Sequence, residues 1–212
     1  MTFKKLSSMQ LDVLGEIGNI GAGNAATSLS QLLNEKIDMV IPSVNVVSFD
    51  EMMEIIGGPD EMVVAILFRV YGDAPSTVIF ILTVEEADTL IQTMLDAPDY
   101  SLIEEGASNK MAMSVLEEVG NIVAGSYIAA LSDFTNLHLQ PSVPHLGIDM
   151  AAAILTYGLI ELSQVSDYAI VIDSKVNSNE NKSAVKGNFF LLPNPDSLDV
   201  IFKALGINDN DE

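Results

Sequence analysis

The chain has 212 residues, of which 49% are apolar, enough to bury a sizeable core in one domain or two small ones. Lysine and arginine number 9 against 30 aspartate and glutamate residues, and the resulting net charge of −21 argues against a nucleic-acid ligand. The absence of cysteine excludes a disulfide framework, a thiol nucleophile and a thiolate zinc site.

The amino-terminal residues do not resemble a targeting segment. Two lysines are followed by apolar residues that polar ones interrupt, unlike the continuous apolar region of a signal peptide. No run in the chain reaches the roughly 18 apolar residues that a membrane-spanning helix needs. We therefore expect no membrane insertion and a cytoplasmic location.

The first half of the chain predicts two long helices with strands between them. Ser7 or Ser8 is suited to cap the first helix, and Thr83 with Glu86 has the pattern of a capping box for the second. The expected elements are a helix to about Leu33, strands at Lys36–Ile41 and Val44–Phe49, a short helix at Asp50–Ile56, strands at Met62–Tyr71 and Ser76–Leu82, and a helix at Val84–Leu95.

A connector is expected at residues 97–107, where a proline and the lack of any sustained hydrophobic period interrupt the pattern. After it, the same order of elements returns. The expected elements are a helix at about Ser108–Phe134, strand residues around Leu137–Val143, a short helix at about Ile148–Gly158, a hairpin of Tyr168–Val176 and Ser183–Leu192 with its turn at Asn177–Lys182, a helix at Pro195–Leu205, and a frayed acidic tail at Asn208–Glu212.

The repeated order predicts one domain, residues 1–212, built from two halves at about 8–96 and 108–206. Because hairpins imply antiparallel pairing, the expected sheet is largely antiparallel, with the long helices packed on it. The fold class is therefore α/β of an α+β-like kind, with a duplicated helix-strand-helix-hairpin-helix unit and pseudo-twofold symmetry.

The repeat is most evident where Leu11–Pro42 and Met113–Pro144 align without a gap, 102 positions apart. Shared apolar residues are expected of any duplicated helix, but shared polar residues need a further reason. The shared or equivalent polar-motif positions are Glu16 and Glu118, Asn19 and Asn121, Pro42 and Pro144, and Asp12 with its counterpart Ser114.

These polar residues share one side of the predicted helix. Asp12, Glu16 and Asn19 fall at i, i+4 and i+7, within a wedge about 60° wide, and Gly23 lies on the same wedge. We call Asp12, Glu16, Asn19 and Gly23 the first polar stripe, and Ser114, Glu118, Asn121 and Gly125 the second. The opposite side is expected to be buried, and its residues in the first copy are Val13, Leu14, Ile17, Ala25 and Leu32.

An exposed asparagine and glutamate are suited to a positioning role. An amide accepts and donates hydrogen bonds at once, so it can orient a water for attack in phosphoryl transfer, while the glutamate binds a cation on the partner. The alternative is that both are ordinary surface residues and that the prolines only end turns. Retention of the residues at identical spacing in both copies favours the functional interpretation.

At these residues the sequence resembles the CheC-type chemotaxis phosphatases, a family that includes CheX and the phosphatase part of FliY. The family motif is aspartate or serine, three residues, glutamate, two residues, asparagine, twenty-two residues and proline. The resemblance covers essentially the whole chain, and its two motifs and length look most like CheC. The matching residues are Asp12, Glu16, Asn19 and Pro42, and again Ser114, Glu118, Asn121 and Pro144.

The resemblance implies hydrolysis of the aspartyl phosphate on the response regulator CheY. Asn19 and Asn121 would orient the water, and Glu16 and Glu118 would engage the regulator's lysine. Magnesium would be held by the regulator, with no cofactor or metal of this chain's own. Family members also bind the receptor deamidase CheD, for which Asp149, expected to open an apolar helix, is the candidate contact.

Other interpretations remain beside this one. Asp149 also fits an ordinary first-turn acid stabilised by the helix dipole. The glycine-containing segment Gly21–Ala26 is similar to a dinucleotide-binding fingerprint. That fingerprint follows a strand, whereas this segment lies within a predicted helix. His138 and His145 lack the nearby acids of a metal site. The main functional alternative is a non-catalytic adaptor that sequesters phosphorylated CheY or regulates CheD.

Overall fold

The computed structural model of the chain describes residues 6–33, 36–41, 43–105, 108–159, 168–178, 185–194 and 196–207. The predictions for Pro42, for the hairpin turn beyond Ser178 and for the acidic tail lie outside these ranges. None of the helices in the described ranges combines the length and apolar character that a membrane span needs.

The elements of the first half follow the predicted order. Ser7 and Gln10 exchange backbone-to-side-chain hydrogen bonds of 2.8 and 3.2 Å, so Ser7 rather than Ser8 caps the first helix. Thr83 and Glu86 form the predicted capping box. The elements are α1 (Ser8–Leu33), β1 (Ile37–Val40), β2 (Val44–Ser48), α2 (Phe49–Ile55), β3 (Met62–Gly72), β4 (Ser76–Thr83) and α3 (Val84–Leu95).

The second half repeats this order after a short helix, α4 (Leu102–Glu105), within the expected connector. One prediction here was wrong. A strand occupies His145–Met150, so Asp149 lies in this strand and does not open a helix. The remaining elements are α5 (Lys110–Thr135), β5 (Leu139–Pro141), β6 (His145–Met150), α6 (Ala151–Leu159), β7 (Tyr168–Ser178), β8 (Val185–Pro193) and α7 (Ser197–Ala204).

In the described part of the chain, eight strands form one sheet in which every pairing is antiparallel. The two central strands, β4 and β8, come from different halves and pair with each other. The strands β1 and β2 of the first half both pair with the long β7, and β5 and β6 of the second half both pair with the long β3. Each half therefore completes the sheet of the other, and the predicted antiparallel α+β fold is confirmed.

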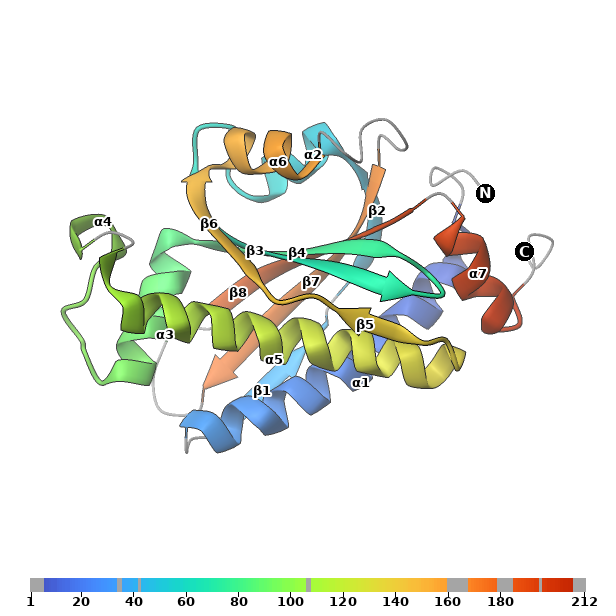
Figure 1. Cartoon of the computed structure of the whole chain (residues 1–212), viewed down its shortest axis with the longest axis horizontal. Coiled ribbons are helices and arrows are strands. Elements are labelled where there is room, and N and C mark those ends of the chain that lie inside the picture. The colour runs from blue at the N-terminus through green and yellow to red at the C-terminus, as the bar shows by residue number, and fades with distance from the viewer. Residues whose placement is uncertain are drawn as a thin grey trace.

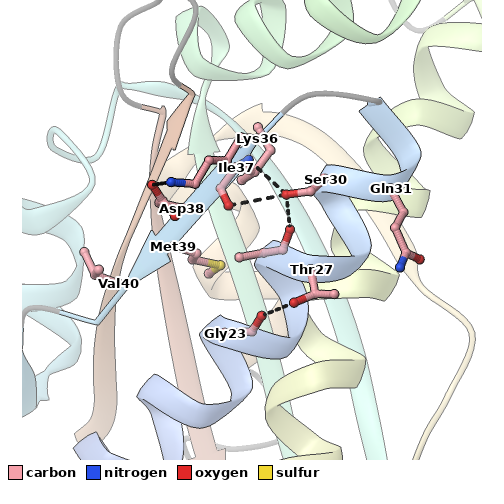
Figure 2. Close-up of a pocket in the computed structure, with 10 residues that line it drawn as sticks. Gly23, Thr27, Ser30, Gln31, Lys36, Ile37, Asp38, Met39 and Val40 are labelled. Carbon is pink, nitrogen blue, oxygen red and sulfur yellow. Dashed lines mark hydrogen bonds and ion pairs between the residues drawn. The ribbon is translucent and has the colours of Figure 1, made fainter.

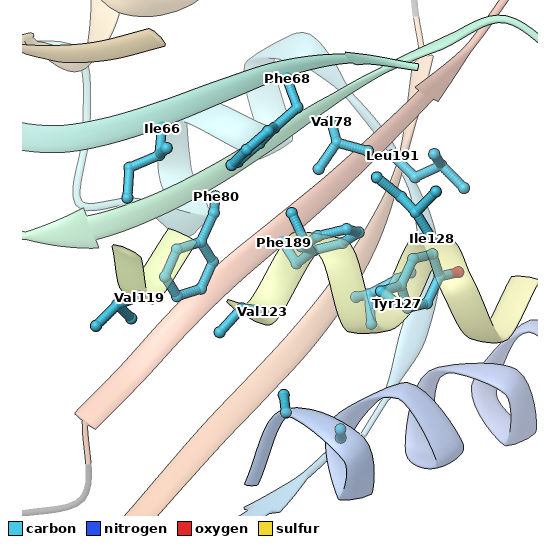
Figure 3. Packing of buried hydrophobic residues seen from close by; sticks show 14 of the residues in the cluster. Ile66, Phe68, Val78, Phe80, Val119, Val123, Tyr127, Ile128, Phe189 and Leu191 are labelled. Atoms are coloured by element: carbon cyan, nitrogen blue, oxygen red, sulfur yellow. The ribbon is translucent and has the colours of Figure 1, made fainter. Parts of the chain in front are cut away.

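The sheet is covered on both faces (Figure 1). The helices α2 and α6 lie over one face above a small apolar cluster, and α1, α3 and α5 lie over the other above the main core. Because β4 is covered on both sides, seven of its eight residues are buried, which accounts for its continuous apolar sequence. Figure 3 shows Phe80 and Phe189 of the sheet facing Val119, Val123 and Tyr127 of α5.

The helices α1 and α5 lie side by side and run in opposite directions (Figure 1). A Cβ atom added to Gly21 would come within 2.8 Å of the Tyr127 Cα atom, so only glycine permits this approach. The aromatic ring of Tyr127 in turn packs on Phe189, with ring centroids 4.8 Å apart. Gly21 therefore lets the two long helices approach each other closely.

One predicted core residue is exposed, and Val13 is only half-buried. Leu32, expected on the buried side of the first helix, is 45% exposed, as is its repeat equivalent Phe134 at 50%. Both residues lie in the last turn of a 26-residue helix. In the same turn of α5 Thr135 is only 4% exposed, so the position of Phe134 is exposed although the turn itself remains packed.

Candidate functional site

The first polar stripe lies on the exposed side of α1. Asp12, Glu16, Asn19 and Gly23 are all exposed. On the opposite side of the helix, Leu14, Ile17 and Ala25 are each about 1% exposed and belong to the main core. The helical periodicity predicted from the sequence therefore orients the polar side chains outward.

The second polar stripe has the same arrangement on α5. Ser114, Glu118 and Asn121 are exposed, and Gly125 is half-buried. Both motifs occupy the amino-terminal halves of their helices, and the helices are antiparallel, so the two stripes lie toward opposite ends of the helix pair. The sequence prediction of two separate sites therefore corresponds to two separate surfaces.

Bare backbone borders both stripes. A Cβ atom added to Gly23 or to Gly125 would meet no atom within 4 Å. Within the described ranges, neither glycine makes a close packing contact of the kind that Gly21 makes. A partner surface can therefore approach the helix backbone directly beside each asparagine.

Asn19 is anchored to the chain segment that follows α1. Its side-chain oxygen accepts a hydrogen bond of 3.1 Å from the backbone N–H of Ile41. This bond leaves the Nδ2 group of the amide and one lone pair of the oxygen available. Sequence reasoning did not foresee this bond, because it joins two residues that are 22 positions apart.

The second asparagine lacks this anchor. The side chain of Asn121 forms no hydrogen bond with another described residue. Val143, which is the repeat equivalent of Ile41, is highly exposed. Pro144 is half-buried at the start of the turn into β6. The two sites thus differ in how firmly the asparagine is held.

The glutamates of the stripes are unengaged. Neither Glu16 nor Glu118 forms a hydrogen bond or ion pair with any described residue. A carboxylate on an exposed helix surface without an internal partner is free to bind an external cation. The role expected of both glutamates, binding a cation on the partner, stays a prediction.

A serine that the two copies share outside the motif, Ser30 and its equivalent Ser132, has a structural role. The Ser30 hydroxyl accepts from the N–H of Ile37 at 2.9 Å and also donates to the carbonyl of Ala26 at 2.7 Å. Its equivalent Ser132 donates to the carbonyl of Leu137 at 2.5 Å. Each serine connects the end of its helix to the segment that leads into the next strand, so retention in both copies does not by itself mark a site.

A groove of about 970 Å³ continues from the first stripe between α1 and β1 (Figure 2). Gly23 and Thr27 of the helix line one wall, and Met39 and Val40 of the strand line the other. An ion pair of 3.6 Å between Lys36 and Asp38 lies at its edge. The first site is therefore open along the helix and is not enclosed like a small-molecule pocket.

The other candidate residues lie away from the stripes. Asp149 is exposed on β6, pairs in register with Val63, and lines a cavity of about 390 Å³ under α6. His138 and His145 are exposed, and the described residues contain no group of three acids, histidines or cysteines suited to a metal ion. The structure thus brings together the stripe residues of each half and leaves Asp149 separate.

Comparison with known proteins points to one family. The sequence model described as the CheC-like family matches residues 9–46 and 111–148, which contain the two stripes. The chain is 42% identical over 204 residues to the CheY-P phosphatase CheC of Bacillus subtilis, covering 96% of this chain and 97% of that protein.

Solved structures show the same fold. FliY of Thermotoga maritima superposes with a TM-score of 0.72 at 18% identity, covering 95% of this chain and 98% of that one. A chain from the CheX-CheY-BeF3-Mg complex of Borrelia burgdorferi superposes with a TM-score of 0.51 at 15% identity, covering 82% of this chain and 96% of that one.

Proposed function

This chain belongs to the CheC-like family, and from that membership we propose that it is a phosphatase that hydrolyses the aspartyl phosphate of the response regulator CheY. The observation that carries the proposal is the pair of exposed stripes, each with a glutamate and an asparagine on an accessible helix surface. The 42% identical relative is named a CheY-P phosphatase, which supports the same substrate.

In the proposed reaction, Asn19 and Asn121 orient the attacking water. The second lone pair of the Asn19 oxygen accepts a hydrogen bond from the water, and Nδ2 donates to an oxygen of the phosphoryl group. The water oxygen forms the new bond to phosphorus as the bond to the aspartyl oxygen breaks, and a proton of the water passes to a phosphoryl oxygen. Free phosphate and the regenerated carboxylate are the products.

Glu16 and Glu118 are proposed to bind the lysine of the regulator's active site. Such a pairing places the asparagine, one helical turn further along, against the phosphoryl group. Asp12 and Ser114 extend the same surface, and Pro42 and Pro144 are the last residues of the two sequence motifs. The magnesium ion belongs to the regulator in this scheme, so this chain supplies positioning and a charge contact.

The reaction is tested by release of phosphate from phosphorylated CheY with this protein at about one tenth of the regulator concentration. A phosphatase accelerates the release and consumes all of the phosphorylated regulator through repeated turnover. The alternative, an adaptor that sequesters phosphorylated CheY, slows the release or leaves it unchanged. Either of these results contradicts the proposed activity.

The receptor deamidase CheD is proposed as a second partner. Asp149 and the cavity beneath α6 form an exposed surface on the sheet face opposite α1 and α5, so both partners can bind at once. Asp149→Lys should weaken CheD binding and leave phosphate release unchanged, whereas Asp133→Lys, on α5, should not affect CheD. Equal CheD affinity for the Asp149 variant and the unchanged protein removes this residue from the surface.

Because CheY and CheD act inside the cell, we propose a cytoplasmic location.

A further inference from the structure

A methionine precedes each polar stripe at the same position of the repeat. Met9 on α1 is 49% exposed, and Met111 on α5 is 65% exposed. The two are identical residues 102 positions apart, each three residues before the first member of its stripe. An unbranched apolar side chain in this position does little for the core of this chain.

The methionines lie on the same side of the helices as the stripes. From Met9, the residues Asp12, Glu16 and Asn19 follow at i+3, i+7 and i+10, which are successive neighbours along one helix face. Met111 stands in the same relation to Ser114, Glu118 and Asn121. Each stripe therefore has an apolar end and a bare glycine end, with the glutamate and asparagine between them.

Exposure alone does not single these methionines out. Leu32 and Phe134 are also equivalent in the repeat and are 45% and 50% exposed. They lie at the other ends of α1 and α5 and about 140° around the helix from the methionines. This pair is therefore a matched control for apolar surface that is outside the stripes.

A partner that reaches the asparagine also covers the methionine. Along the helix axis Met9 is about 10 Å from Glu16 and about 15 Å from Asn19. A specific protein interface of about 800 Å² on each side extends about 16 Å from its centre. An interface centred on the glutamate therefore includes the methionine, and the charge of −21 on this chain leaves apolar burial as a main source of affinity for an anionic phosphoryl partner.

We infer that Met9 and Met111 are apolar contact residues that bind the surface of the phosphorylated response regulator beside its phosphorylation site. This inference rests on the proposed function for the identity of the partner. The flexible methionine side chain adapts to the surface it meets, which suits a contact made twice in different surroundings. The contact contributes to binding and does not touch the reacting atoms.

The test isolates one site at a time. Met9→Gln is made in a protein whose second site carries Asn121→Ala, and Met111→Gln in one whose first site carries Asn19→Ala. Each should raise KM for phosphorylated CheY about fivefold with kcat retained, because about half of an apolar side chain loses its burial. Leu32→Gln and Phe134→Gln in the matching backgrounds should change KM less than about twofold. An unchanged KM in the methionine variants, or an equal rise in the controls, overturns the inference.

Binding is measured separately from hydrolysis, so that the proposed phosphatase activity and the proposed methionine contact are tested independently. Binding of CheY loaded with beryllofluoride and Mg²⁺, a stable substitute for the phosphorylated form, reports contact without hydrolysis. Binding that weakens about fivefold in the methionine variants supports the contact even if no hydrolysis occurs, a result that contradicts only the proposed function. Binding that is unchanged in both variants overturns the contact whatever the rate of hydrolysis.

Discussion

The side-chain oxygen of Asn19 accepts a hydrogen bond from the backbone N–H of Ile41, 3.1 Å away and 22 residues later in the chain. The bond joins the exposed side of α1 to the segment after β1. The second copy keeps the same distance from Asn121 to Pro144 without such a bond among the described residues, so the bond alone does not account for the spacing. The bond holds the asparagine of the first site in one orientation before any partner binds.

Asn19→Asp separates the anchor from the chemistry. The carboxylate retains an acceptor for the Ile41 N–H, but it cannot donate to the phosphoryl group and adds a negative charge beside it. With the second site inactivated by Asn121→Ala, we expect phosphate release to fall about a hundredfold. Hydrogen exchange of the Ile41 amide should remain slow in Asn19→Asp and become fast in Asn19→Ala. Equal exchange in both variants would show that the bond does not order this segment.

Gly23→Ala should make the protein more stable and less active. The added methyl group meets no atom within 4 Å, and alanine is favoured over glycine in a helix interior by about 1 kcal/mol. The same methyl group occupies the space that a partner needs beside Asn19. Denaturant unfolding should show the gain, and KM of the isolated first site should rise. A gain in stability with unchanged KM would place the partner elsewhere.

Gly21→Ala is the matched control, two residues away on the buried side of the same helix. Its methyl group would come within 2.8 Å of the Tyr127 backbone, so α1 and α5 must separate. We expect a loss of about 1 to 3 kcal/mol in the free energy of unfolding. Together the two variants distinguish a glycine needed for helix packing from one needed for partner access.

Tyr127 makes stability fall at high pH. Burial raises the pKa of its phenol well above the ordinary value of 10.0, and in the described part of the chain its hydroxyl has no hydrogen-bond partner. Below about pH 10 the phenol is neutral in both states and stability is unaffected. Above that pH the unfolded chain loses the proton first, so this residue lowers the free energy of unfolding by about 1.4 kcal/mol per pH unit.

Tyr127→Phe should remove this contribution. The free energy of unfolding, measured with denaturant at about pH 8 and about pH 11, should fall less in the variant than in the unchanged protein, because the other tyrosines and the lysines are common to both. Near neutral pH the variant should be as stable as the unchanged protein or more stable by about 1 to 3 kcal/mol, because it no longer buries an unpaired hydroxyl. A parallel loss in both proteins would show that the phenol ionises in the folded state as readily as in the unfolded one.

Hydrophobic periodicity and capping residues were sufficient to predict most of the fold. The helices of both halves, the hairpins and the antiparallel pairing were all predictable, because each depends on local patterns that the sheet then reinforces. The exposed side of α1 was also predictable, since Glu16 and Asn19 share one helical face.

The strand β6 was missed because its residues read equally well as the start of an apolar helix. The repeat carried the missing information. Ser48 ends β2 and Phe49 begins α2, and the equivalent positions are Met150 and Ala151, where β6 ends and α6 begins. Local pattern cannot decide between strand and helix for a short apolar run, but alignment of the two halves does.

Contacts between distant segments could not be predicted from local patterns. The bond from Asn19 to Ile41 depends on where β1 leaves the sheet, and the exposure of Leu32 depends on how the last turn of α1 packs. The difference between the anchored Asn19 and the free Asn121 is likewise a tertiary property, because the two motifs read alike in sequence.

The most direct test is the rate of phosphate release from phosphorylated CheY by four matched proteins. They are the unchanged chain, the pair Glu16→Ala and Asn19→Ala, the pair Glu118→Ala and Asn121→Ala, and all four substitutions together. Since all four side chains are exposed, the variants should fold normally. We expect each pair to retain part of the activity and the fourfold variant to release phosphate no faster than CheY alone. A fourfold variant that remains fully active would contradict the assignment of both sites.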